Sequence, residues 1–137
     1  MIEPSQYLAR AKRKDNDAWE TGSLVVIRGE TSEEQVFLAD EMTGALIPVQ
    51  AETVGRLTGL TDKNGKKVFE GDIVRFRTRV DYFSGPYYVK WYEEGLRFLA
   101  TMRDGVRSYP MDRCWEYEVL GNVYDNPDLL GGVSDGN

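Results

Sequence analysis

The stretch TGLTDKNGKKVFEGDIVRF, residues Thr58–Phe76, is the part of the sequence that most clearly indicates the fold. It contains the residue types of a tight turn and then the start of a strand. Within it, the carboxylate of Asp62 can accept hydrogen bonds from main-chain N–H groups a few residues further along the chain. Asn64 and Gly65 follow, and both residue types tolerate the left-handed dihedral angles of a tight turn. The stretch therefore predicts a turn that is held by its own polar side chain.

Further glycines and an acidic bend frame the strand that follows this turn. Gly59 and Gly71 are expected to adopt backbone angles that other residues avoid, and Asp72 is expected to fix the bend by bonding to the main chain. The strand is predicted from Ile73 to Val80. Its alternation places Val74, Phe76 and Val80 inward and Arg75, Arg77 and Arg79 outward. We assign a structural role to seven residues of the turn and bend: Gly59, Asp62, Asn64, Gly65, Glu70, Gly71 and Asp72.

Strand-sized runs recur at short intervals along the rest of the chain. They cover residues 6–14, 18–29, 35–40, 45–49, 85–94, 95–103, 105–111 and 115–124. Pro48 indicates an edge strand, and Gly95 and Gly105 are expected to take the positive φ of two hairpin turns. Asn126 and Pro127 predict a short C-terminal helical turn. This pattern is typical of a mainly β sandwich, barrel or meander, predicted as one domain over residues 1–130 with a disordered tail over 131–137.

Composition excludes several classes of function. The 137 residues contain no histidine and one cysteine, Cys114. Ser-His and Cys-His nucleophile pairs and ordinary zinc sites are therefore ruled out, and Cys114 is expected to be a small buried hydrophobe. No apolar run is long enough to span a bilayer and no signal peptide is evident, so a cytoplasmic protein that does not bind membranes is expected. The net charge of −6 disfavours general binding of nucleic acid.

Three stretches resemble the YopX family. ETVGRLTGLTDKNGKKVFEGDIVRF (Glu52–Phe76) is similar to the family signature, in outline E-T-V-G-Q-(Y/F)-T-G-L-x-D-K-N-G-(K/V)-x-(I/V)-(F/Y)-E-G-D-I-V, with Arg56 in place of the usual Gln. YEVLGNVYDNPDLL (Tyr117–Leu130) resembles its second signature, E-V-I-G-N-I-Y-E-N-P-E-L-L. YLARAKRKDNDAWETGSLV (Tyr7–Val25) is similar to its first strand and the following W-x-x-G-x-L. Only the region from about Arg79 to Arg113 carries little of the pattern.

The resemblance implies a phage or prophage protein of the bacterial cytoplasm. It implies a mainly β fold in which bifurcated antiparallel sheets form a pseudo-barrel with little helix, and it implies homo-oligomers. It brings no enzymatic activity, no cofactor and no catalytic residue. We therefore expect an accessory factor that is not an enzyme and that binds itself or a host or phage protein.

An arginine stripe and an aromatic cluster supply the candidate binding surface. Its residues are Arg75, Arg77, Arg79, Tyr82, Phe83, Tyr87, Tyr88 and Tyr92. On this interpretation the segment DYFSGPYY, residues 81–88, is a loop tip that contacts a partner. The same arginines, joined by Arg10, Lys12 and Lys14, could instead bind phosphates while Tyr88 or Tyr92 stacks bases, which is the nucleic-acid alternative. The structural interpretation is a solvated strand face beside an alternating core that contains Tyr87, Val89 and Trp91.

Three carboxylates near the turn leave a metal-dependent alternative open. Asp62, Glu70 and Asp72 could supply oxygen ligands to Mg²⁺ or Ca²⁺, as in a metal-dependent hydrolase. Their spacing does not match the alternating ligands of a calcium loop. The residue types and positions favour the structural role instead, so no metal site is predicted.

Overall fold

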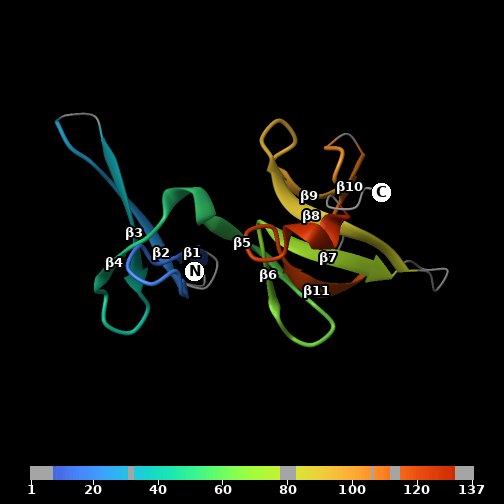
Figure 1. Cartoon of the computed structure of the whole chain (residues 1–137), viewed down its shortest axis with the longest axis horizontal. Helices are drawn as coiled ribbons and strands as arrows, with labels where there is room; N and C mark the ends of the chain where they lie inside the picture. Colours follow the sequence, from blue (N-terminus) through green and yellow to red (C-terminus); the bar gives the residue numbers. More distant parts are fainter. Residues whose placement is uncertain (1–7, 31–32, 78–82, 106, 112–114, 132–137) are drawn as a thin grey trace. The chain divides into compact units, whose positions relative to one another are not determined.

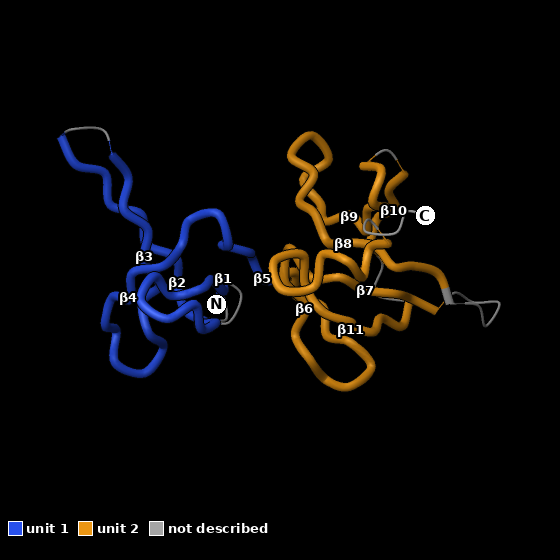
Figure 2. Tube along the Cα trace, viewed as in Figure 1, with its two compact units in different colours: residues 1–57 blue, residues 58–137 orange. Residues whose placement is uncertain are grey.

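The protein is mainly β, with two antiparallel sheets, one of them curled into a half-barrel, as the sequence predicted (Figure 1). The computed structural model describes residues 8–30, 33–77, 83–105, 107–111 and 115–131. Across these residues the only helical segments are two 3-10 turns, η2 (Ala51–Thr53) and η3 (Pro127–Leu130). The chain divides into two compact units, unit 1 over Met1–Leu57 and unit 2 over Thr58–Asn137 (Figure 2). The prediction of a single domain over residues 1–130 is not tested by this division and stays a prediction.

A six-stranded sheet has the order β4-β3-β2-β1-β5-β6. Its strands are β1 (Leu8–Lys12), β2 (Trp19–Arg28), β3 (Glu34–Asp40), β4 (Leu46–Pro48), β5 (Gly55–Thr61) and β6 (Lys67–Phe69). β5 begins in unit 1, where Gly55 pairs with Arg10 of β1, and it ends in unit 2. Pro48 lies in the edge strand β4, as predicted, where its missing N–H costs no ladder bond.

A five-stranded sheet lies within unit 2 and has the order β10-β9-β8-β7-β11. Its strands are β7 (Asp72–Arg77), β8 (Phe83–Tyr92), β9 (Arg97–Thr101), β10 (Ser108–Pro110) and β11 (Glu116–Asn122). The predicted strand from Ile73 to Val80 thus ends earlier within the described residues, at Arg77. Residues 78–82, which include Arg79, Val80 and Tyr82, lie outside the described part, as does the tail over 132–137.

Each unit has its own hydrophobic core. In unit 1 the core cluster is aliphatic and consists of Ala9, Ala11, Leu38 and Val49. In unit 2 the core is larger and aromatic, and it consists of Val68, Val74, Phe76, Tyr87, Val89, Ala100 and Tyr117. The inward positions predicted for Val74 and Phe76 are confirmed, but Ile73 is buried as well, so β7 does not follow a simple alternation.

Glycines take the strained positions at most of the predicted turns. Gly59, Gly65, Gly71 and Gly105 all have positive φ, as expected. The turn after β8 differs from the prediction, because Leu96 rather than Gly95 has the positive φ, at 50°. Gly95 instead leaves space for the neighbouring ring, since a Cβ there would lie 2.6 Å from Cδ2 of Tyr92. At the C-terminus, Asn126 precedes η3 and Pro127 begins it, as predicted.

Candidate functional site

Asp62 holds together two distant parts of unit 2. Its Oδ1 accepts hydrogen bonds from the main-chain N–H groups of Asn64 and Lys66, both at 2.9 Å. Its Oδ2 accepts a third, at 3.1 Å, from the N–H of Val119 in β11. Burial opposes ionisation of Asp62, which is only 6% exposed, but the hydrogen bonds from Val119, Lys66 and Asn64 outweigh it and lower the pKa of the carboxyl. The carboxylate therefore acts as a structural acceptor within the fold.

The acidic bend is tied to the main chain in the same way. Oδ2 of the buried Asp72 accepts a hydrogen bond from the N–H of Phe69 at 2.8 Å. Gly71 has φ 94°, donates to the carbonyl of Val89 at 2.8 Å and accepts from Val123 at 2.9 Å. Within the described ranges, no group of three His, Cys, Asp or Glu side chains is placed to hold a metal ion. The carboxylates of Asp62 and Asp72 thus face N–H donors of the chain itself.

The two described arginines of the stripe pair with glutamates of the neighbouring strand. Arg75 Nε lies 2.6 Å from Glu118 Oε1, and Arg77 Nη1 lies 3.5 Å from Glu116 Oε1. In the register of β7 and β11, Glu118 is opposite Arg75 and Glu116 is opposite Arg77. The structure thus presents alternating opposite charges here rather than a uniformly basic strip, which is the arrangement that stabilises neighbouring strands.

The aromatic cluster is divided between the two faces of β8. Residues 83–88 lie in strand rather than in a loop tip, which corrects the sequence prediction for the described part of that segment. Tyr87 is buried against Phe76, with ring centroids 5.2 Å apart, so it is unavailable to a partner. Tyr88 is partly exposed and Tyr92 is exposed. Tyr82 and the side chain of Phe83 lie outside the described part.

A cavity of about 300 Å³ opens on the outer face of the five-stranded sheet. Its lining residues are Lys90, Tyr92, Leu99, Thr101, Gly105 and Ser108. Lys90 is opposite Leu99 in the register of β8 and β9, and Ser108 is opposite Thr101 in that of β9 and β10. Lys90 was not among the candidate binding residues predicted from the sequence, because no local pattern shows which residues of neighbouring strands lie around it.

The basic residues of β1 surround a tryptophan in unit 1. The guanidinium carbon of Arg10 lies 4.8 Å, and Nζ of Lys12 lies 5.5 Å, from the ring centroid of Trp19. Trp19 is the register partner of Lys12 across β1 and β2. Arg10, Lys12 and Lys14 were suggested as phosphate ligands in addition to the arginine stripe. Two of these three, Arg10 and Lys12, thus contact an aromatic ring, a favourable contact for a cation.

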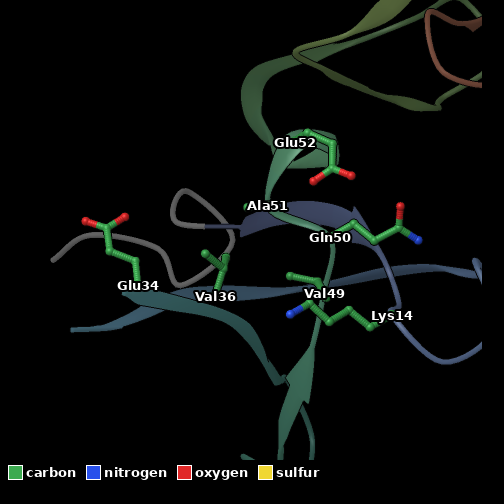
Figure 3. Close-up of a pocket in the computed structure, with 7 residues that line it drawn as sticks. All are labelled: Lys14, Glu34, Val36, Val49, Gln50, Ala51 and Glu52. Carbon is green, nitrogen blue, oxygen red and sulfur yellow. The ribbon is translucent and has the colours of Figure 1, made fainter. Parts of the chain in front are cut away.

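The third cation, Lys14, lines a smaller cavity of about 200 Å³ in unit 1. Figure 3 shows Val36 and Val49 at its centre with Lys14 beside Val49, while Glu34 and Glu52 lie at its periphery on separate segments. Glu34 also forms an ion pair with Arg28, and the amide of Gln50 donates to the carbonyl of Arg13 at 3.0 Å. The cavity therefore presents charges of both signs around an apolar floor.

The β2–β3 hairpin exposes a patch of large apolar side chains. Leu24 is 41% exposed, Val26 49% and Ile27 44%. Successive residues of a strand point to opposite faces, so Val26 and Ile27 are exposed on different faces of the hairpin. From the sequence this run was predicted only to be a strand, because β-branched runs indicate strands without showing what packs on them.

A comparison with protein families matches residues 8–131 to the family described as YopX protein. The chain belongs to the YopX family. The match covers both units, including the region from about Arg79 to Arg113 in which the family pattern was weak. No curated protein matches the chain. In the described ranges, no helix has the length and apolar character needed to cross a membrane.

Proposed function

We propose that this YopX-family protein is a binding module that is not an enzyme and that assembles with further copies of itself through the β2–β3 hairpin of unit 1. The observation that carries the proposal is the exposure of Leu24, Val26 and Ile27. Exposure of large apolar side chains to water is unfavourable, and the free energy falls when a protein surface covers them. The hairpin thus replaces the aromatic segment over residues 81–88 as the proposed contact surface.

The backbone of β2 supports the same interface. β1 pairs with β2 from Lys12–Trp19 to Leu8–Ser23, so among the described residues Leu24–Arg28 form ladder bonds with β3 alone. A strand edge of this kind can accept another strand, and its main-chain hydrogen bonds then add to the burial of apolar side chains. A second copy offers the same edge, as a two-fold symmetric contact requires.

The nucleic-acid alternative receives less support from the side chains. Arg75 and Arg77 each lie beside a glutamate of β11, and Arg10 and Lys12 lie against Trp19. A phosphate chain would have to displace these contacts as well as overcome the net charge of −6. We therefore propose that the partner is a protein, in the cytoplasm of a bacterial host. Besides a second copy of the chain, the candidates for binding to this hairpin are host and phage proteins.

The test is the solution mass of the full chain, measured by light scattering over a range of concentrations. Wild type should be heavier than one chain, and Val26→Lys and Ile27→Lys should shift the mass toward that of the monomer. The matched control is Met42→Lys, which also places a charge at an exposed apolar residue of unit 1, 93% exposed in the turn after β3. It should leave the mass unchanged. A wild type that stays monomeric at every concentration would contradict self-assembly.

A further inference from the structure

The outer-face cavity of unit 2 combines a cation, an aromatic ring and two hydroxyl groups. Lys90 and Tyr92 come from β8, Leu99 and Thr101 from β9, and Ser108 from β10. Thr101 is buried although it is polar, and its Oγ1 accepts a hydrogen bond from Oγ of Ser108 at 3.1 Å. Three strands thus bring polar groups and the apolar Leu99 together around one space of about 300 Å³. Sites for small organic ligands begin at about this volume.

The aromatic wall of the cavity is fixed in position by the turn that follows β8. A Cβ on Gly95 would approach Cδ2 of Tyr92 to 2.6 Å and Cε2 to 2.9 Å, so the ring lies directly against the glycine backbone. Nε of Arg97, the register partner of Tyr92, lies 3.5 Å from the carbonyl oxygen of Gly95. A ring that is already held by its surroundings loses little conformational entropy when a ligand packs on it.

Among the residues that line the cavity, Lys90 is the charged one. Across the described residues, Lys90 has no carboxylate within ion-pairing distance. The acidic residue of the adjoining β9–β10 turn, Asp104, forms an ion pair with Arg107 at 3.4 Å. Glu93, next to Tyr92, accepts a hydrogen bond from the indole N–H of Trp91 at 2.8 Å. Lys90 therefore offers its ammonium group to an external anion.

We propose that this cavity binds a small organic anion that carries a planar ring, of the chemical class of a nucleoside monophosphate. The ammonium group of Lys90 neutralises the phosphate as a point charge. The ring of Tyr92 stacks with the planar group, and Leu99 contacts its apolar edge. The hydroxyls of Thr101 and Ser108 supply a hydrogen-bonding partner at the buried end. This inference concerns unit 2 and does not depend on self-assembly through the β2–β3 hairpin.

The free monophosphate is favoured over the end of a nucleic-acid strand. A single lysine balances one phosphate group, and the ion-paired Arg75 and Arg77 provide no adjoining basic track. The net charge of −6 repels a polyanion more strongly than a single phosphate ester. An oligonucleotide consequently gains little from its additional phosphates and experiences more repulsion.

The test is calorimetric titration of the full chain with adenosine monophosphate, adenosine, inorganic phosphate and a pentanucleotide. Wild type should bind adenosine monophosphate saturably, with adenosine and inorganic phosphate each weaker by about tenfold or more, because each lacks one half of the recognised chemistry. Lys90→Gln should weaken binding of the monophosphate by about tenfold or more. Tyr92→Leu should weaken it by about fivefold or more through loss of stacking.

The matched control is Lys67→Gln, which removes an exposed lysine of β6 in the same unit and should bind as wild type does. Circular dichroism is the control that each variant is folded. Lys90 is exposed, so its replacement should be compatible with the fold. The proposal is overturned by no binding of adenosine monophosphate up to about 10 mM, by equal affinity for adenosine, or by equal affinity of the Lys90→Gln and Lys67→Gln variants. Tighter binding of the pentanucleotide would overturn the assignment to a free monophosphate.

Discussion

Unit 1 and unit 2 are both antiparallel β structures, yet the side chains that fill their cores differ in kind. Unit 2 buries Phe76 between aromatic neighbours, with ring centroids 4.5 Å from Trp115 and 5.2 Å from Tyr87. Unit 1 buries Ala9, Ala11, Leu38 and Val49, while Leu24, Val26 and Ile27 remain exposed. Apolar residues in a strand therefore do not by themselves make a core. In unit 2 the buried aromatic residues stabilise the unit, whereas the exposed Leu24, Val26 and Ile27 of unit 1 are the residues for which we propose contact with another molecule.

The largest expected effect is that of Phe76→Ala in the core of unit 2. It removes a buried ring that contacts Trp115 and Tyr87, and large-to-small changes of this type cost about 3–5 kcal/mol of unfolding free energy. Chemical denaturation with hydrogen exchange measures it. Because β5 runs from unit 1 into unit 2, we expect amides of both units to lose protection together, as for one domain. Protection retained in unit 1 alone would show instead that the units unfold separately.

The next largest effect is expected for Asp62→Ala. The change removes the two oxygens that accept three main-chain hydrogen bonds, and one of the donors is Val119 in the partly buried β11. Hydrogen bonds to a charged acceptor contribute about 1.5–3 kcal/mol each, and they are not additive, so a loss of about 3 kcal/mol is expected in urea denaturation. Asp62→Asn keeps one acceptor oxygen and should lose less. Equal stability of wild type and Asp62→Ala would contradict the structural role.

The same carboxylate gives a pH dependence with a definite sign. The pKa of Asp62 in the folded protein lies below its ordinary value of 3.8. The carboxylate therefore contributes stability that is fully present above that ordinary value and is lost as the pH falls toward the folded-state pKa. Between neutral pH and about pH 3, wild type should lose more unfolding free energy than Asp62→Asn, which has no proton to bind there. An identical loss in both proteins would contradict a lowered pKa of Asp62 in the folded state.

Asp40 provides the unit 1 counterpart of Asp62 and a smaller expected effect. Its Oδ2 accepts from the N–H groups of Met42 and Thr43 at 3.0 and 2.9 Å, and these bonds together with one from the Thr43 hydroxyl lower the pKa of Asp40. All its partners lie in the same exposed turn. Asp40→Ala should therefore cost less unfolding free energy than Asp62→Ala, as loss of a local cap does, in the denaturation experiment used for Asp62→Ala. A cost as large as that of Asp62→Ala would remove the distinction between local and long-range acceptors.

Asp62 also shows how far the sequence could predict this structure. Its role in the turn was predictable because Asn64 and Lys66 lie within four residues of it, and local chemistry is encoded locally. Its bond to Val119, 57 residues away, follows from the position of β11, which no local pattern specifies. The strands, the edge position of Pro48 and the family resemblance were likewise predictable from short stretches.

Burial and pairing between strands were harder to predict. The run Leu24–Ile27 has strand propensity, but its exposure depends on which elements pack over β2. Arg75 and Arg77 form an arginine stripe when β7 is considered alone, and they become ion pairs only when β11 lies beside them. The cavity beside Lys90 likewise depends on how the three consecutive strands β8, β9 and β10 pair. The candidate site was therefore predicted less well than the fold.

The smallest expected effect concerns the cross-strand pair of Arg75 and Glu118 in unit 2. The atoms lie 2.6 Å apart, but the arginine side chain is 41% exposed, so water screens the attraction. A double-mutant cycle with Arg75→Gln and Glu118→Gln should give a coupling free energy of about 0.2–1 kcal/mol, reduced by added salt. The unit 1 pair of Arg13 and Asp15, 2.9 Å apart in an exposed turn, should give less, because its residues are only two positions apart and join no separate strands. Equal coupling in the two cycles would mean that pairing across the sheet adds nothing to the attraction between the charges, and the contrast between the units would then lie in their apolar side chains alone.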